Sequence, residues 1–250
     1  MSSAHVTEPD AQGCTGVNGA PHHLRLSRPP RHDIWTLGYG RRTVIWTQGC
    51  RHACDGCMSP ETWDPEAGES WNVDDVVDEI IAGLPAASGL SVSGGDPIDW
   101  SSALVELLRK VRGRCGGDYD ILVYTGYRFN TLRQRVPELL ELVDVIIDGR
   151  FNKSLTEPPL PWRGSSNQEV HLLTPLARRR YIDINVAREH PPLQLVSIKP
   201  SPLRVGVELA GIASTGELSR WEGEMKRLGL RSESDDAGGV PASEELGPCP

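Results

Sequence analysis

Strand-like and helix-like segments alternate along the middle of this 250-residue chain, and this alternation limits the folds that it can adopt. Short apolar runs read as strands at 43–47, 90–93, 121–124 and 143–147. Apolar residues at helical spacing lie between them at 73–84, 104–111 and 131–142, with Pro137 as an expected irregularity. Strands and helices that alternate through short loops form a sheet covered by helices. The sequence therefore predicts an α/β fold with a mostly parallel sheet.

Glycine and polar residues follow each expected strand, in the order Gly49-Cys50, Gly94-Gly95, Thr125-Gly126 and Asp148-Gly149. The carboxyl ends of parallel strands meet at one edge of a sheet, where ligands of such folds bind. These residues are therefore expected to form one site.

The two ends of the chain differ in composition from its middle. Residues 1–32 are rich in Pro, His, Ser and Gly, and residues 231–250 are acidic and rich in Gly and Pro, so both are expected to be disordered tails. Between them we expect a core at 33–172 and an extension at 173–230 that packs on it. Within the extension, 181–186, 193–198 and 203–209 read as strands and 217–228 as a closing helix.

Composition narrows the range of functions and partners that the chain can have. The net charge of −8 argues against a nucleic-acid partner bound through a general basic surface. No apolar run approaches the roughly 20 residues that span a bilayer, and the first residues do not resemble a secretory signal, so no membrane partner and a cytoplasmic location are expected.

Three of the six cysteines, Cys50, Cys54 and Cys57, lie within eight residues. Thiolates at this spacing can hold one metal centre from a single loop, and Asp55-Gly56 provides the turn. A [4Fe–4S] cluster usually has four thiolate ligands, so three would leave one iron open to an exogenous ligand. A zinc site with His52 as the fourth ligand and a set of unligated buried thiols are the alternatives.

These cysteines at the end of a first strand resemble the signature of the radical SAM enzymes. The run from Gly49 to Cys57, followed by Thr62-Trp63, resembles more narrowly the activating proteins of anaerobic ribonucleotide reductases. Further motifs of that group are similar to the segments 90–97, 124–127, 148–151 and 162–168. The resemblance covers about residues 33–172 and implies a partial (β/α) barrel of the radical SAM type. Gly56 departs from the aromatic residue of many radical SAM enzymes, and Met58 from the aromatic residue that often follows the third cysteine in the activating group.

The resemblance also implies site residues. Cys50, Cys54 and Cys57 would hold a [4Fe–4S] cluster whose open iron binds S-adenosylmethionine (SAM). The SAM contacts would come from the strand ends and the closing loop, namely Ser93, Gly94, Gly95, Asp96, Thr125, Asp148, Asn167 and Met58.

Each of these assignments has a structural alternative. Gly94-Gly95 would hold the methionine amino group, or form an ordinary turn. Asp96 would order its loop or hold a monovalent cation, unless it is a solvated carboxylate. Thr125 and Asp148 would reach the ribose or the charged groups of SAM, or cap the segments that follow. Asn167 would contact the cofactor or belong to a hydrogen-bonded turn, and Met58 would present an apolar surface to adenine.

Three functions follow. The first is reductive cleavage of SAM to a 5′-deoxyadenosyl radical that installs a glycyl radical on a partner enzyme subunit of the anaerobic ribonucleotide reductase or pyruvate formate-lyase type, with an electron donor of the flavodoxin or ferredoxin type. The second is a radical SAM enzyme that acts directly on a small molecule or peptide. The third is an iron–sulfur redox protein without turnover, which would need no SAM site.

Overall fold

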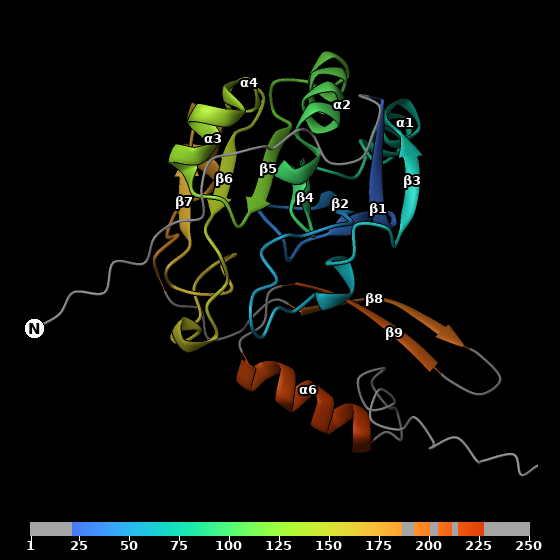
Figure 1. Cartoon of the computed structure of the whole chain (residues 1–250), viewed down its shortest axis with the longest axis vertical. Helices are drawn as coiled ribbons and strands as arrows, with labels where there is room; N and C mark the ends of the chain where they lie inside the picture. The colour runs from blue at the N-terminus through green and yellow to red at the C-terminus, as the bar shows by residue number, and fades with distance from the viewer. Residues whose placement is uncertain (1–21, 187–192, 201–204, 212–214, 228–250) are drawn as a thin grey trace, which may run out of the picture.

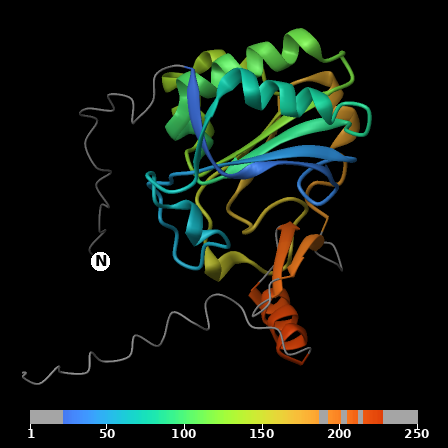
Figure 2. The same ribbon diagram turned by 90° about the vertical axis from the view of Figure 1, so that its right-hand side faces the viewer.

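The computed structural model describes residues 22–186, 193–200, 205–211 and 215–227. Its centre is an open seven-stranded sheet in the order β3-β1-β2-β4-β5-β6-β7. The helices of the crossover segments cover one face of the sheet, whereas long loops, a short helix, and a β-hairpin with the helix that follows it lie on the other side (Figure 1, Figure 2). Residues 1–21 of the predicted amino-terminal tail and the whole predicted tail at 231–250 lie outside the described residues.

Four neighbouring strands in the centre of the sheet are parallel. They are β2 (Arg42–Thr47), β4 (Gly89–Gly94), β5 (Asp120–Thr125) and β6 (Val145–Asp148). The crossover segments contain α1 (Val73–Ala82), α2 (Ser101–Arg114), α3 (Phe129–Arg135) and α4 (Pro137–Leu140). The α/β class is thus confirmed. The expected helix over 131–142 is interrupted at Val136, because Pro137 cannot continue a helix hydrogen-bond ladder.

The outer strands make the sheet mixed rather than mostly parallel. β1 (His23–Ile34) pairs antiparallel with β2 and with β3 (Glu69–Asn72), and β7 (Glu169–Leu172) pairs antiparallel with β6. The prediction of a disordered tail up to residue 32 is wrong from His23 onward. Leu24 and Leu26 are fully buried in the core, and β1 accommodates Pro29 and Pro30 through irregular pairing. The sequence did not predict this strand, because its short alternation of apolar and polar residues is interrupted by two prolines.

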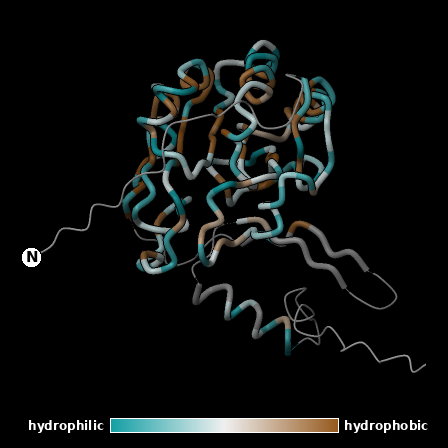
Figure 3. The backbone as a smooth tube through the Cα atoms, viewed as in Figure 1, coloured by the Kyte–Doolittle hydropathy of each residue, from teal (hydrophilic) through white to brown (hydrophobic). Residues whose placement is uncertain are grey.

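The sheet divides the core into two layers. The larger apolar cluster lies between the sheet and α1, α2 and α4, with fully buried side chains such as Val76, Leu104 and Leu107. Smaller clusters on the opposite face include Trp46, Leu122 and Ile147. Figure 3 shows the hydrophobic stretches concentrated on the strands and on the helices above them, whereas the loops on the opposite side are mostly hydrophilic. The loops beyond the strand ends are therefore available for polar chemistry.

The extension after β7 begins with α5 (Pro175–Arg180), followed by the hairpin β8 (Leu193–Pro200) and β9 (Val205–Gly211) and by α6 (Thr215–Arg227). The hairpin strands and the closing helix agree with the sequence prediction, whereas the expected strand at 181–186 consists of irregular backbone and a turn. The open end of the hairpin is bonded to the core, because the Trp35 amide donates to Oε1 of Gln194 (3.0 Å) and the Thr36 hydroxyl to the Ala210 carbonyl (3.1 Å).

Short 3-10 turns lie in the loops at the strand ends, over Pro60–Thr62 (η1), Pro97–Trp100 (η2) and Lys153–Leu155 (η3). Within the described part of the chain, none of the helices is long and apolar enough to cross a membrane.

A buried ionic network closes the amino-terminal end of the central strands. Nη2 of Arg42 lies 2.9 Å from Oδ2 of Asp120, and both side chains are fully buried. Arg180 pairs with the other carboxylate oxygen (2.6 Å), and the Tyr181 hydroxyl donates to Asp120 (2.9 Å). Burial alone would lower the pKa of Arg42, but its interactions with Tyr181 and with the carboxylate of Asp120 raise it above its usual value, so the guanidinium stays charged. The network fixes the start of the extension to the core.

We expect Asp120→Asn to lower the free energy of unfolding by about 3–5 kcal/mol, because it leaves Arg42 buried without a counter-charge. Urea denaturation followed by circular dichroism measures this loss. Asp118→Asn, at an exposed position two residues away, is the matched control and should change stability little. Equal effects of the two variants would contradict the assignment.

Candidate functional site

The three cysteines lie on one loop between β2 and η1. Hydrogen bonds close the base of this loop, because the Gly49 amide donates to the Thr62 carbonyl (2.8 Å) and the Cys50 amide to the Trp63 carbonyl (3.1 Å). The Cys57 amide donates to the Cys54 carbonyl (3.0 Å), so the second half of the loop forms a tight turn. All three thiols are partly buried and free. The loop therefore presents them from a closed backbone frame.

The spacing of the thiols argues against a single metal ion. Within the described residues, the three sulfurs do not form a group whose members all lie within 4.8 Å of one another. Thiolates on one tetrahedral zinc ion lie about 3.8 Å apart, because a Zn–S bond is about 2.3 Å long. The alternative fourth ligand, His52, has its ring nitrogens against Asp96 and Arg150. The loop as described therefore does not hold the three thiols in the arrangement of a closed zinc site.

Burial raises the pKa of the Cys50 thiol to about 11, and the nearby carboxylates of Asp96 and Asp99 add to the rise. Burial also raises the pKa of the Cys54 thiol, and the neighbouring Cys57 contributes to this rise. In the metal-free protein these thiols are therefore held as neutral groups. A metal that binds them as thiolates must displace their protons.

Gly94 and Gly95 bring the end of β4 against the start of the cysteine loop. A Cβ on Gly94 would lie 2.4 Å from the backbone of Thr47, and one on Gly95 would lie 2.1 Å from the Gly49 carbonyl oxygen. The Gly95 amide donates to Thr47 (2.7 Å) and the Asp96 amide to Gly49 (2.8 Å). The close approach that requires these glycines is thus an approach of the chain to itself.

Asp96 is almost completely buried and joins three segments. Its carboxylate caps η2 by accepting from the Ile98 amide (3.0 Å). It also accepts from the Thr125 hydroxyl (2.9 and 3.0 Å) and from the Gly126 amide (2.8 Å). Asp96 therefore orders the loop at the strand ends, which is one of the two roles predicted for it. Thr125 donates one of these hydrogen bonds and therefore has the same structural role.

Asp148 lies at the end of β6 and holds the start of α3. It accepts from the Phe129 amide (2.6 Å), and Arg128 and His171 lie 3.5 Å and 3.4 Å from its carboxylate oxygens. Burial raises the pKa of Asp148, but His171, the Phe129 amide and Arg128 together lower it below its usual value. Ligand atoms of Asp148, Glu169 and His171 lie within 4.8 Å of one another, and Arg128 already supplies positive charge there.

The segment Trp162–Gln168 forms a closed turn beside this group. Oε1 of Gln168 accepts from the Gly164 (2.8 Å) and Ser165 (3.2 Å) amides, and Nε2 of Gln168 donates to the Gly149 carbonyl (2.9 Å). Nδ2 of Asn167 donates to the Arg150 carbonyl (2.8 Å). The Oδ1 atom of Asn167 is buried without a hydrogen-bond partner among the described residues. Asn167 thus has a free acceptor, whereas Gln168 is used within the turn.

The remaining two predicted contacts are less distinctive. Ser93 is half-buried near the end of β4, and its carbonyl accepts from the Thr47 hydroxyl (3.2 Å). Met58 is half-buried directly after the third cysteine. Both lie next to the assembled loop and strand ends.

Two residues that link the site were not singled out by the sequence as linking residues. Arg150 donates from Nε to Nδ1 of His52 (3.0 Å) and joins the end of β6 to the cysteine loop. Arg163 is buried and donates to the backbone carbonyls of Gln168 and Ile184, and burial lowers its pKa. Each arginine lies next to a glycine in a loop, which was the available signal, but its partners are distant in sequence.

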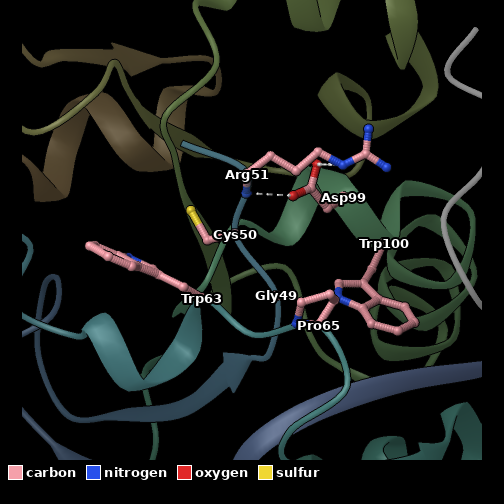
Figure 4. Close-up of a pocket in the computed structure, with 7 residues that line it drawn as sticks. All are labelled: Gly49, Cys50, Arg51, Trp63, Pro65, Asp99 and Trp100. Atoms are coloured by element: carbon pink, nitrogen blue, oxygen red, sulfur yellow. Dashed lines mark hydrogen bonds and ion pairs between the residues drawn. The ribbon is translucent and has the colours of Figure 1, made fainter. Parts of the chain in front are cut away.

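A cavity of about 270 Å³ opens beside the first cysteine. Figure 4 shows the residues that line it, with Cys50 next to Trp63, and Trp100 and Pro65 below. The amide of Arg51 donates to Asp99 (3.4 Å) at the rim, and Nε1 of Trp100 donates to the Gln48 carbonyl (2.6 Å). The cavity therefore gives access to the cysteine loop between the aromatic side chains of Trp63 and Trp100.

Comparisons with known proteins agree with this geometry. Residues 36–171, more than half of the chain, match the model of the "4Fe-4S single cluster domain" family. Relatives named "Anaerobic ribonucleoside-triphosphate reductase-activating protein" include that of Escherichia coli K12 (35% identity over 141 residues, 54% of this chain and 91% of the relative). Those of Vibrio cholerae (38% over 143 residues, 55% and 91%) and Enterobacteria phage T4 (36% over 137 residues, 53% and 85%) are similar.

The fold and the three-thiol loop thus define an iron–sulfur protein of the α/β class. The chain belongs to the 4Fe–4S single cluster domain family, together with these activating proteins. The part of the chain after residue 171 lies beyond the match to the family model.

We expect Gly95→Ala to lower the free energy of unfolding by about 1–3 kcal/mol, because its Cβ would meet the Gly49 carbonyl oxygen at 2.1 Å. Thermal unfolding of the metal-free protein measures the change. Gly113→Ala is the control, since nothing lies within 4 Å of its Cβ and alanine favours helix α2. A Gly95 variant as stable as the wild type would show that the two loops are not in close contact.

In the metal-free protein, alkylation of Cys50 by iodoacetamide should become about tenfold faster per pH unit between pH 8 and 10, because only the thiolate reacts. The rate should level off near pH 11, where the buried thiol ionises. In the urea-unfolded chain the rate should level off near the ordinary cysteine pKa of about 8.5. Mass spectrometry of the labelled peptide gives both profiles, and identical profiles would contradict burial of this thiol.

Proposed function

We propose that this chain is a radical SAM enzyme that installs a glycyl radical on a partner enzyme. One observation carries the proposal: a loop with three thiols lies against the ends of β4, β5 and β6, in a chain whose relatives are named as activating proteins of an anaerobic reductase. A cluster-binding redox protein would need only the loop, and not the polar groups at the strand ends.

Cys50, Cys54 and Cys57 would hold the [4Fe–4S] cluster, and three ligands leave one iron for SAM. With SAM bound and one electron added, such a cluster supplies the reductive cleavage of the carbon–sulfur bond. The other groups of the chain would position and shield the cofactors. No acid–base pair is needed for this chemistry.

Among the predicted SAM contacts, Asn167 has the strongest support, because its Oδ1 is buried without a partner and needs a donor such as an amino or hydroxyl group. Asp148 is next, with a carboxylate held ionised at the end of β6. Gly94, Gly95, Ser93 and Met58 would contribute backbone groups and apolar surface. Asp96 and Thr125 would act by fixing the strand ends, since the donors around Asp96 leave little room for a monovalent cation.

The partner would be the glycyl-radical subunit of an anaerobic ribonucleotide reductase, as the names of the relatives suggest. A low-potential protein of the flavodoxin or ferredoxin type would supply the electron. A reaction on a small molecule or peptide is the second candidate, which the aromatic cavity beside Cys50 favours.

Anaerobic mixing of the reduced enzyme, SAM and the reductase subunit should give the doublet spectrum of a glycyl radical in electron paramagnetic resonance (EPR). Release of 5′-deoxyadenosine without this doublet would favour the second candidate.

We expect Cys54→Ala to lose the [4Fe–4S] cluster and the release of 5′-deoxyadenosine from SAM and dithionite. Iron and sulfide analysis, absorbance near 400 nm and chromatography of the nucleoside measure these losses. Cys115→Ala is the matched control, because Cys115 packs at the end of α2 away from the loop, and it should keep both properties. A full cluster signal in Cys54→Ala would contradict the ligand assignment, and a loaded wild-type enzyme without nucleoside release would contradict the reaction.

A further inference from the structure

His52 lies inside the cysteine loop, between the first and second cysteines, and its side chain is only 6% exposed. An imidazole on a loop of this kind would normally point to solvent, because no apolar core surrounds it. Here it points inward and fills the space between the loop and the strand ends. The contacts of this ring come from three different strands.

The ring contacts residues that lie just after each of the three parallel strands β4, β5 and β6. From the end of β4, Oδ2 of Asp96 lies 2.9 Å from Nε2, at an angle that is not that of a hydrogen bond. Beyond β5, the Tyr127 ring meets the imidazole edge to face, with 4.5 Å between centroids. Beyond β6, Nε of Arg150 donates to Nδ1 (3.0 Å).

The backbone around His52 is adapted to this placement. Ala53, the next residue, has a φ of 42°, which lies in the left-handed region that costs a non-glycine residue about 1 kcal/mol. On the facing strand end, a Cβ on Gly126 would lie 2.3 Å from Cδ2 of the imidazole. The loop thus adopts a strained backbone and the strand end lacks a side chain at the point where the ring is inserted.

We propose that His52 is a positioning residue that fixes the Cys50–Cys54 half of the loop against the strand ends before any cluster is present. The proposal rests on the proposed function only for the identity of the metal centre. His52 is not a ligand, because both ring nitrogens face other groups. His52 acts through the backbone, because the residues on either side of it set the distance between Cys50 and Cys54. Its loss would leave this half of the loop held at its base and by the long contact of the Arg51 amide with Asp99 (3.4 Å).

The first test uses the metal-free protein, so it does not depend on the chemistry of the loaded enzyme. In His52→Ala, amide hydrogen exchange should become faster over 50–54 and over 126–127, whereas 60–63 at the base of the loop should be unchanged. His23→Ala removes an exposed histidine on β1 and should leave both segments unchanged. Unchanged exchange over 50–54 in His52→Ala would overturn the proposal.

The second test uses the reconstituted protein. Chelation by EDTA should remove the cluster about tenfold faster from His52→Ala than from the wild type, in line with the usual effect of groups that orient metal ligands. The EPR spectrum of the reduced cluster should change less when SAM is added, because the open iron would be displaced relative to the strand ends. His52→Gln, which keeps a polar group in place, should restore part of both properties. A merely structural role would lower stability but leave the SAM-induced change intact, and that result would overturn the proposal.

A double-mutant cycle shows whether the effect passes through the imidazole. Gly126→Ala should displace the ring and give the same accelerated chelation as His52→Ala. In the His52→Ala background, Gly126→Ala should add little, because the space is then free. Additive effects of the two changes would contradict the proposal. A wild-type protein that binds no [4Fe–4S] cluster would instead contradict the proposed function, while the exchange test would still decide the role of His52.

Discussion

The carboxylate of Asp96 is the contact on which the site depends, because it joins the ends of two parallel strands and the start of η2 in one buried point. A buried carboxylate is stable only when its oxygens are satisfied, and here they receive a hydroxyl and two backbone amides. This fixed point allows the cysteine loop to dock, since His52 packs beside Asp96 and the Asp96 amide holds Gly49. The position of the thiols is therefore a consequence of hydrogen bonds made outside their loop.

The two ends of the central strands use buried charge in different ways. At the amino-terminal end, Arg42 and Asp120 neutralise each other inside the core and tie the extension to the sheet through Arg180 and Tyr181. At the carboxyl-terminal end, polar atoms such as Oδ1 of Asn167 remain without a partner among the described residues. The amino-terminal end thus holds a closed ionic network, whereas the carboxyl-terminal end keeps a polar acceptor, Oδ1 of Asn167, that a ligand can use.

The extension beyond residue 172 adds contacts to this frame without supplying residues to the cysteine loop. Arg163 links the closing turn to Ile184, and the hairpin is bonded to the segment before β2. The relatives that match the core are covered over about nine-tenths of their length, so the core by itself corresponds to almost the whole of those proteins. Among the described residues, the extension therefore contributes to the frame of the core rather than to the backbone hydrogen bonds that close the cysteine loop.

The sequence by itself determined the parallel centre of the fold and the order of the strand ends, because hydrophobic period and glycine position are local properties. It also determined the cysteine loop, whose spacing is a property of one short segment. Only the tertiary structure decided that His23–Ile34 is a strand, since its pairing partners lie elsewhere in the chain. It likewise decided that Asp96 and Thr125 satisfy each other, that Asn167 keeps a free acceptor, and that His52 turns inward. Each of these outcomes depends on contacts between segments that are distant in the sequence, and no local sequence pattern predicts such contacts.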